Sequence, residues 1–196
     1  EKLTFVAFMV ITIDGAAGVG KTSTAKELAK RLGYQYFDTG AMYRAVTFFF
    51  INQNVDLTSI SEVNNSLRSI KLHIDFSSES DMRIFLDEDD VSLKIRSQKV
   101  TRMVSAVSAI KEVREMMVQI QRSFTSEGNF VVEGRDIGTV VFPDSKYKFY
   151  LQADYDIRAK RRLADFEKIN EAKNINEIKK DLETRDKYDK TRKLSP

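Results

Sequence analysis

The 196-residue chain contains no cysteine and a single histidine. Without cysteine it cannot form disulfides, thiolate zinc sites, iron–sulfur clusters or a cysteine nucleophile. One histidine, His73, cannot build a histidine-rich metal site and leaves little room for a hydrolase that relays protons through histidine. No apolar run approaches the roughly 18 residues that a transmembrane helix needs. These absences exclude several large classes of protein.

The composition is that of an ordinary folded domain, with 42% hydrophobic and 31% charged residues. The length suits one compact domain, or one domain with a small insertion. There are 32 basic and 29 acidic residues, a net charge of +3. That excess is too small to indicate a nucleic-acid-binding surface, but it permits a local cluster of arginines around an anionic ligand.

The amino-terminal segment needs an interpretation of its own. Residues 5–13 are largely apolar and follow Lys2, which loosely resembles a signal peptide. Cleavage after them would damage the glycine-rich loop that begins directly after Asp14, so we interpret the run as a buried parallel strand at about residues 8–13. Met9 could be the natural start, with residues 1–8 an extension.

The glycine-rich loop matches G-x-x-x-x-G-K-S/T at every fixed position and lies between a predicted strand and a predicted helix. Glycines let successive backbone N–H groups converge on a phosphate, and the helix N-terminus adds partial positive charge. Lys21 is expected at the β- and γ-phosphates of ATP and the Thr22 hydroxyl at Mg²⁺. The predicted ATP-binding residues are Gly15, Ala16, Ala17, Gly18, Val19, Gly20, Lys21, Thr22 and Ser23.

Strands and helices alternate along most of the chain, which predicts an α/β fold with a parallel sheet flanked by helices. A core of residues 9–57 and 98–196 is expected. Residues 58–97 interrupt it with a hairpin pattern, strands near 72–76 and 82–86, which predicts a small antiparallel insertion. Further elements are expected as helix at 100–124, strands at 130–133 and 148–152, and helices at 154–169 and 174–192, with residues 154–170 forming a helical lid.

The loop predicts a nucleoside triphosphate but not a reaction. A GTPase would carry D-x-x-G and N-K-x-D motifs, and neither occurs. A motor ATPase is usually larger and carries an apolar strand ending in Asp-Glu, which the segment FVVEG at 130–134 only distantly approaches. A small-molecule kinase is the remaining class for a chain of this length.

Two clusters follow predicted strands, where ligands bind in open α/β sheets. The first cluster is DTGAMYR at 38–44, in which Arg44 could reach a phosphate. The alternative is that Asp38 or Thr39 only caps the next helix. The second is EGRD at 133–136; Arg135 and Asp136 at a buried strand end need partners, and a structural ion pair is the alternative.

Periodicity indicates where other charges face. On the last predicted helix one stripe continues from aliphatic into charged residues: Ile175, Ile178, Leu182, Arg185, Asp189 and Arg192. On a predicted helix over 103–121 a weaker stripe contains Met103, Val107, Ile110, Arg114 and Met117. Arg158, Arg161 and Arg162 share a face and could stabilise charge on a transferring phosphoryl group. Solvated charged faces are the alternative in each case.

The segments ITIDGAAGVGKT, YFDTGAMYRAVT, VEGRDIGTVVFPD, RAKRRL and TRDKYDKTRKLSP resemble the bacterial cytidylate kinases, in that order and from about residue 9 onward. The resemblance implies transfer of the ATP γ-phosphoryl group to CMP or dCMP, with Mg²⁺. It implies an acceptor pocket with Thr39, Tyr43 and Arg44, and nucleotide contacts from Arg135 and Asp136. By the same resemblance, Arg185 and Asp189 would contact the base or the sugar of the nucleotide. Arg114 and Arg192 would hold its α-phosphate. The lid would contain Arg158, Arg161 and Arg162. The insertion would be the acceptor (NMP-binding) domain.

The chain departs from the family pattern at three places. Ala16 stands where proline is frequent, and Glu133 stands where aspartate is common, which affects its role toward a magnesium-bound water. The family also usually continues 25–30 residues past the Ser-Pro at 195–196.

We expect a cytoplasmic monomer without nucleic-acid or membrane partners. A P-loop kinase for another nucleotide or a shikimate-like acid, and an ATP-dependent RNA-associated module, are the alternatives.

Overall fold

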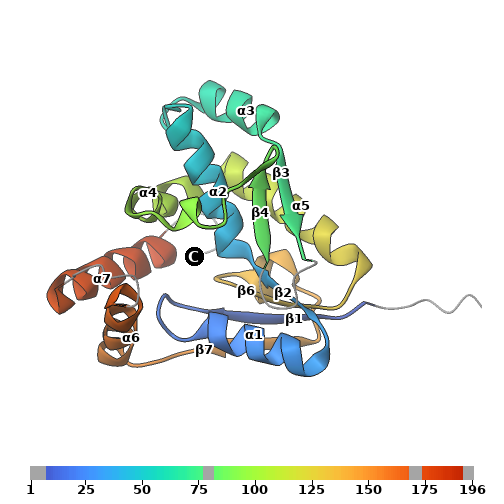
Figure 1. Cartoon of the computed structure of the whole chain (residues 1–196), viewed down its shortest axis with the longest axis vertical. Helices are drawn as coiled ribbons and strands as arrows, with labels where there is room; N and C mark the ends of the chain where they lie inside the picture. The colour runs from blue at the N-terminus through green and yellow to red at the C-terminus, as the bar shows by residue number, and fades with distance from the viewer. Residues whose placement is uncertain (1–7, 77–81, 168–173, 192–196) are drawn as a thin grey trace, which may run out of the picture.

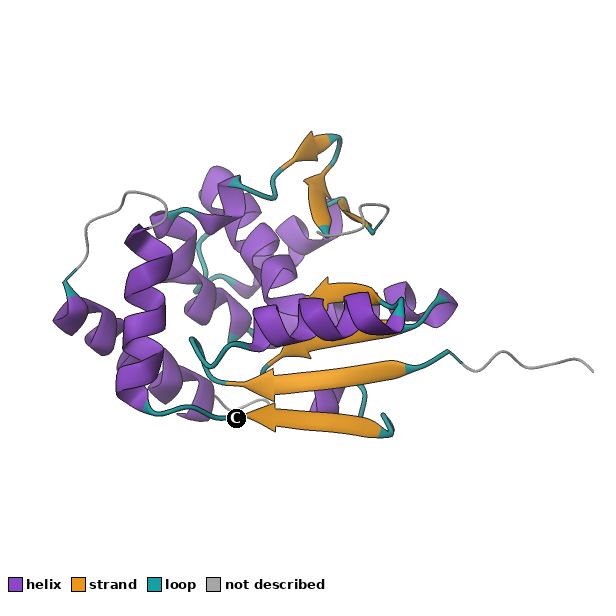
Figure 2. Ribbon diagram, turned by 60° about the horizontal axis from the view of Figure 1, so that its bottom comes forward, coloured by secondary structure: helices purple, strands orange, loops and turns teal. Residues whose placement is uncertain are grey.

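The computed structural model describes residues 8–76, 82–167 and 174–191. Its centre is a four-stranded parallel sheet in the order β2-β6-β1-β7 (Figures 1 and 2). The strands are β1 (Val10–Gly15), β2 (Gln35–Asp38), β6 (Phe130–Gly134) and β7 (Tyr147–Leu151). The register pairs Asp38 with Glu133 and Asp14 with Gly134, so three acidic side chains lie at the carboxyl ends of neighbouring strands. The predicted parallel α/β architecture is confirmed.

Helices cover both faces of this sheet. α1 (Lys21–Leu32) packs Ala25 and Ala29 on Ile11, Ile13 and Val131. α2 (Thr39–Asn52) and α5 (Lys111–Phe124) cover the opposite face in the larger core, which contains Phe37, Phe130 and Val132. α1 ends at Gly33, whose left-handed φ of 65° lets its N–H close the last turn.

The insertion holds more structure than its hairpin pattern indicates. β3 (Leu72–Asp75), β4 (Arg83–Leu86) and the short β5 (Asp89–Asp90) form an antiparallel sheet, followed by a 3₁₀ turn at Lys94–Arg96. The predicted turn at 77–81 lies outside the described residues. α3 (Ile60–Ser69), which the sequence analysis did not predict, begins at Ser59, whose hydroxyl accepts a hydrogen bond from the Glu62 N–H.

The single helix expected over residues 100–124 is wrong. The chain forms α4 (Gln98–Ser108) and α5, separated at Ala109 and Ile110, where Ile110 is extended at ψ 127°. The predicted stripe from Met103 to Met117 therefore spans two helices. The break is stabilised because the Arg114 guanidinium donates to the carbonyl of Ser108, at the free end of α4.

α6 (Tyr155–Glu167) and α7 (Ile175–Thr191) pack against each other beside the carboxyl ends of the strands (Figure 1). Ala159, Ile178 and Leu182 form a small core that includes Ala17 of the glycine-rich loop. The predicted stripe on α7 is thus confirmed at its aliphatic end. Among the described helices none is both long and apolar enough to cross a bilayer.

Candidate active site

The glycine-rich loop holds its carbonyl oxygens toward cationic side chains. Gly15, Gly18 and Gly20 adopt positive φ angles of 149°, 76° and 98°, which side chains rarely tolerate. Four loop carbonyls accept charged hydrogen bonds of 2.7–2.9 Å: Gly15 from Arg135, Ala16 from Lys21, Ala17 from Arg158 and Val19 from Arg161. In a trans peptide the following N–H points the opposite way, so these contacts turn N–H groups away from the cations. Such a loop is suited to bind an anion through its backbone N–H groups, and we refer to residues 15–22 as the phosphate cradle.

Lys21 and Glu133 form the charged centre beside this loop. Burial, and next the positive charge of Arg135, lower the pKa of Lys21 to about 7. Burial and the nearby Asp38 raise the pKa of Glu133. Tyr36 donates a hydrogen bond from its hydroxyl to Glu133, and Thr22 hydrogen-bonds with both of them. Thr22 is exposed, with its hydroxyl at the start of α1, and Ser23 donates to the Gly20 carbonyl at 3.0 Å.

Asp14 fixes the turn that follows β6. Its two carboxylate oxygens accept from the N–H groups of Ile137 and Gly138, each at 2.8 Å. Burial raises the pKa of Asp14, while these two hydrogen bonds act against the rise. From this turn Arg135 reaches the Gly15 carbonyl of the loop, whereas Asp136 pairs with Arg114 of α5. The sequence analysis mentioned Asp14 only as the residue before the loop. The signal for its role was an acidic residue on a buried strand, directly before a phosphate-binding loop.

Four arginines from separate segments converge next to the loop. Arg44, Arg135, Arg162 and Arg185 lie close enough that their charges act on one another. Burial, together with the charges of neighbouring arginines, lowers the pKa of Arg185 to about 9. Burial lowers the pKa of Arg44 to about 10, with Asp38 acting against the fall and neighbouring arginines adding to it. The buried Nε of Arg185 has no hydrogen-bond partner among the described residues. An excess of buried positive charge with an unused donor fits an anionic ligand.

The remaining predicted acceptor residues meet in the same region. Arg114 and Asp136 form a buried ion pair, and the Arg114 guanidinium lies 5.8 Å from the ring centroid of Tyr43. Asp189 accepts from Arg135 at 2.9 Å. Thr39 is buried and donates to the Glu133 carbonyl at 2.7 Å. Arg192 lies outside the described residues.

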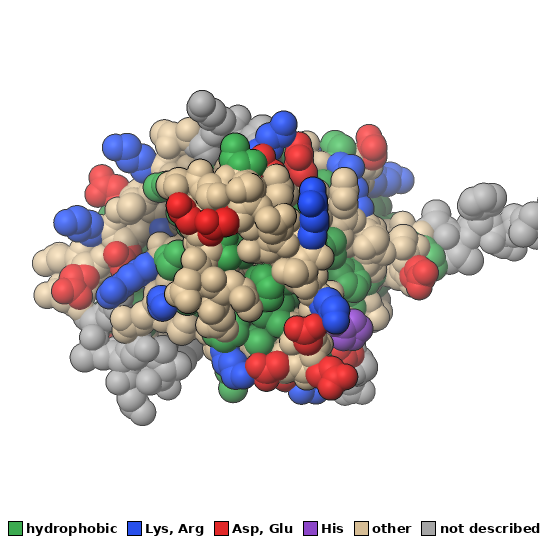
Figure 3. Space-filling model, turned by 90° about the horizontal axis from the view of Figure 1, so that it is seen from above, with side chains coloured by type: hydrophobic (Ala, Val, Ile, Leu, Met, Phe, Trp, Pro, Cys, Tyr) green, Lys and Arg blue, Asp and Glu red, His purple; other side chains and the backbone are tan. Residues whose placement is uncertain are grey.

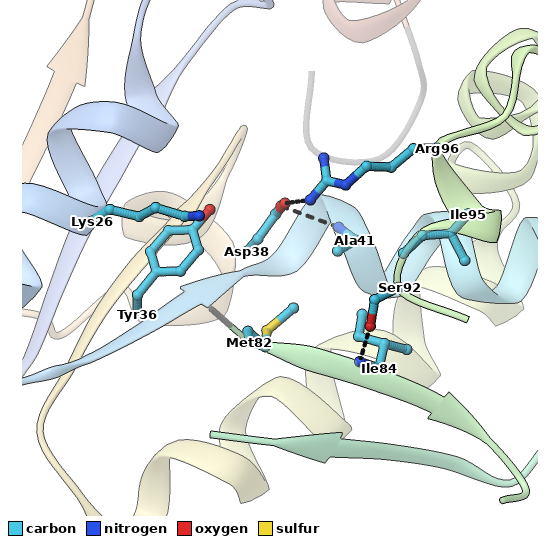
Figure 4. A pocket seen from close by; sticks show the side chains of 9 residues that line it. All are labelled: Lys26, Tyr36, Asp38, Ala41, Met82, Ile84, Ser92, Ile95 and Arg96. Carbon is cyan, nitrogen blue, oxygen red and sulfur yellow. Dashed lines mark hydrogen bonds and ion pairs between the residues drawn. The ribbon is translucent and has the colours of Figure 1, made fainter. Parts of the chain in front are cut away.

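A cavity of about 30 Å³ separates the core from the insertion at this site (Figure 4). Lys26, Tyr36 and Asp38 line it from the core, and Arg96 reaches toward Asp38 from the 3₁₀ turn, with 3.9 Å between the charged atoms. Arg44 crosses to the insertion side as well, donating to the carbonyl of Ile95 and the hydroxyl of Thr101. The volume accommodates about one water molecule.

Sequence reasoning missed Tyr36, Arg96 and Asp186 at this site. Asp186 binds Arg158 through both oxygens, at 2.7 and 2.8 Å. The signal for Asp186 was its place next to Arg185 on the charged part of α7. Nothing in the local sequence singles out Tyr36 or Arg96, because their partners are remote.

The donor set fits a magnesium ion better than a transition metal. Thr22, Glu133 and Asp38 offer only oxygen atoms. No group of three potential acidic or histidine ligands occurs within the described ranges. Mg²⁺ prefers oxygen and is usually held by one or two protein ligands together with water and substrate phosphates.

Comparison with known proteins agrees with this geometry. The family model named Cytidylate kinase matches residues 11–196. Cytidylate kinases from Desulfitobacterium hafniense and Caldanaerobacter subterraneus are 40% and 42% identical over 95% of this chain, which covers 79% and 81% of their lengths. A bifunctional pantoate ligase/cytidylate kinase from Prochlorococcus marinus is 45% identical, also over 95% of this chain, which spans only 36% of that protein. These matches show that the chain belongs to the cytidylate kinase family.

Proposed function

We propose that this chain transfers the γ-phosphoryl group of ATP to CMP or dCMP, giving CDP or dCDP. The observation that carries the proposal is the convergence of Arg44, Arg135, Arg162 and Arg185 beside the phosphate cradle, with a buried unpaired Nε on Arg185. One anion site is built by the loop and a second by the arginines. Two adjacent anion sites are what a reaction between a triphosphate and a monophosphate requires.

On the donor side, the loop N–H groups and Lys21 bind the ATP phosphates. Lys21 now donates to the Ala16 carbonyl and exchanges that contact for a phosphate oxygen. Thr22 would hold Mg²⁺ directly, and Glu133 would orient its water. When bound, Mg²⁺ neutralises phosphate charge during transfer. Arg161 and Arg162 extend from α6 toward the transferred group.

On the acceptor side, Arg44, Arg135 and Arg185 neutralise the α-phosphate, for which the planar guanidinium is well suited. Arg185 also contributes, with Asp189, to the nucleoside end of the pocket. The predicted α-phosphate contact from Arg192 falls outside the described residues. Arg135 and Asp136 contact the cytosine nucleotide, and Arg114, which pairs with Asp136, helps to hold its α-phosphate. The insertion, residues 58–97, acts as the acceptor domain; Arg96 from the insertion and Arg44 from α2 close the pocket.

The chemistry needs no covalent protein intermediate and no dedicated base. A phosphate oxygen of CMP is already a nucleophile at neutral pH. The protein aligns two repelling anions, spreads the charge of the transferring group over Lys21 and the arginines, and excludes water on closure of α6 and α7. The enzyme acts as a cytoplasmic monomer on small molecules.

A coupled assay with CMP, dCMP, UMP and AMP tests the proposal. CMP and dCMP are expected to be the preferred acceptors, and Arg185→Ala should lose CMP turnover far more than ATP binding. Preference for AMP would contradict a cytidylate kinase. Tight, salt-sensitive RNA binding without kinase activity would instead favour an RNA-associated module. The face over α3 and the antiparallel sheet carries charges of both signs around apolar side chains rather than a broad basic surface (Figure 3).

A further inference from the structure

Arg158 is held from two sides at once. Its Nε donates to the Ala17 carbonyl of the phosphate loop at 2.7 Å, and its two terminal nitrogens bind the two oxygens of Asp186 on α7. The Arg158 and Asp186 side chains are only 8% and 17% exposed. The α6 backbone itself lies against the loop, because a Cβ on Gly18 would come within 3.1 Å of the Arg158 carbonyl oxygen.

A second contact of the same form lies one turn further along α7. Asp189 holds the Nε of Arg135 at 2.9 Å, and Nη1 of Arg135 donates to the Gly15 carbonyl at 2.9 Å. Two carboxylates of one helix therefore each fix an arginine, and each arginine fixes one carbonyl of the loop. α7 also carries Arg185 of the acceptor cluster.

We propose that Asp186 is a positioning residue for ATP binding: it holds Arg158 against the Ala17 carbonyl and so fixes the peptide plane that aims the Gly18 N–H into the phosphate cradle. The inference rests on the proposed function for the identity of the nucleotides. A bidentate carboxylate restricts the guanidinium to one plane, which a single hydrogen bond does not do. Asp186 acts only through Arg158 and touches neither nucleotide.

The chain offers a matched control that joins the same two helices. Asp156 on α6 pairs with Lys179 on α7 at 2.6 Å, with side chains 70% and 38% exposed. Within the described parts of the chain, neither side chain bonds to the phosphate loop. Asp156→Asn thus removes an ion pair between α6 and α7 without releasing a loop carbonyl, whereas Asp186→Asn releases the guanidinium that holds Ala17.

The experiment measures ATP and CMP affinities separately by calorimetry on wild type, Asp186→Asn and Asp156→Asn, with thermal melting of each. Asp186→Asn should weaken ATP binding about 10- to 100-fold, while CMP binding stays within about twofold. Asp156→Asn should change neither affinity. Equal ATP affinity in the two variants, or a loss confined to CMP, would overturn the proposal.

Arg158→Lys provides a second test if Asp186→Asn does not fold. Lysine keeps the charge but cannot bind Asp186 through two nitrogens and Ala17 together, so the same selective loss of ATP affinity is expected. In the double variant Asp186→Asn/Arg158→Lys, ATP affinity should equal that of Arg158→Lys alone; additive losses would contradict action through Arg158. A wild-type chain that binds ATP but phosphorylates no cytidine nucleotide would contradict the proposed function and leave this comparison intact.

Discussion

Arg114 and Asp136 face each other in the interior, with side chains 5% and 8% exposed, although 21 residues separate them in sequence. They join α5 to the turn after β6, and therefore hold the acceptor pocket and the sheet together. Because charges removed from water depend on their partners, the pair is vulnerable to loss of either member.

Arg114→Met should destabilise the fold by about 3–5 kcal/mol, because it leaves the Asp136 carboxylate buried and unpaired. Urea unfolding measures the change, and the double variant Arg114→Met/Asp136→Asn should recover part of it. Arg83→Met is the matched control: its pair with Asp90 is exposed, and its loss should cost at most about 1 kcal/mol. Equal costs at both sites would contradict this account of the buried pair.

Arg185→Met should stabilise the ligand-free protein while abolishing CMP turnover. Burial and the charges of Arg135, Arg44 and Arg162 disfavour a cation at this position, and no described residue hydrogen-bonds with its Nε. A gain of about 1–2 kcal/mol in unfolding free energy is expected, the usual exchange of stability for function at a binding site. Arg31→Met, on an exposed pair, should change stability by less than about 0.5 kcal/mol. Destabilisation by Arg185→Met would refute a strained cation cluster.

Lys21→Met should change stability in a pH-dependent manner. The Lys21 pKa falls from 10.5 to about 7 on folding, so between those values the unfolded chain binds more protons and wild-type stability rises with pH. Below about pH 7 Lys21 is charged in both the folded and the unfolded chain, so the folded protein bears the full free-energy cost of burying the ammonium group. Lys21→Met should therefore gain most over wild type at pH 6 and progressively less toward pH 9, as followed by chemical unfolding. A difference independent of pH would contradict the lowered pKa.

Gly15→Ala should be far more damaging than Gly33→Ala, although both glycines have positive φ angles. A Cβ on Gly15 would lie 2.4 Å from the Leu151 carbonyl oxygen of β7, whereas nothing lies within 4 Å of one on Gly33. We expect about 1 kcal/mol for Gly33→Ala from backbone strain alone. Gly15→Ala should exceed about 2 kcal/mol because β1 and β7 must also separate. Similar melting temperatures for the two variants would show that the crowding is relieved elsewhere.

Local signals in the sequence predict the parallel sheet and the cradle well. A buried strand, a glycine loop and a helix follow one another without remote contacts, and β1 lies close to its expected position. The stripe on α7 is similarly local, since helix periodicity alone orients Arg185 and Asp189.

Features that depend on remote partners could not be predicted in this way. The break between α4 and α5 contains no glycine or proline, and it is stabilised by the side chain of Arg114 from beyond the break. Tyr36 becomes significant only because parallel pairing of β2 with β6 brings it to Glu133. Asp186 is one charge among several on an exposed part of a helix until α6 packs beside it.

The hydrogen bonds that hold four carbonyls of the phosphate loop affect the thermodynamics of ATP binding. Its backbone is already in the receptive shape before any nucleotide arrives, so association orders few main-chain dihedrals and forfeits little conformational entropy. The Lys21 ammonium must relocate from a neutral oxygen to an anionic one. A triphosphate should accordingly dock with a small heat-capacity change and a rapid on-rate, leaving slow rearrangement to the helices that close over the acceptor.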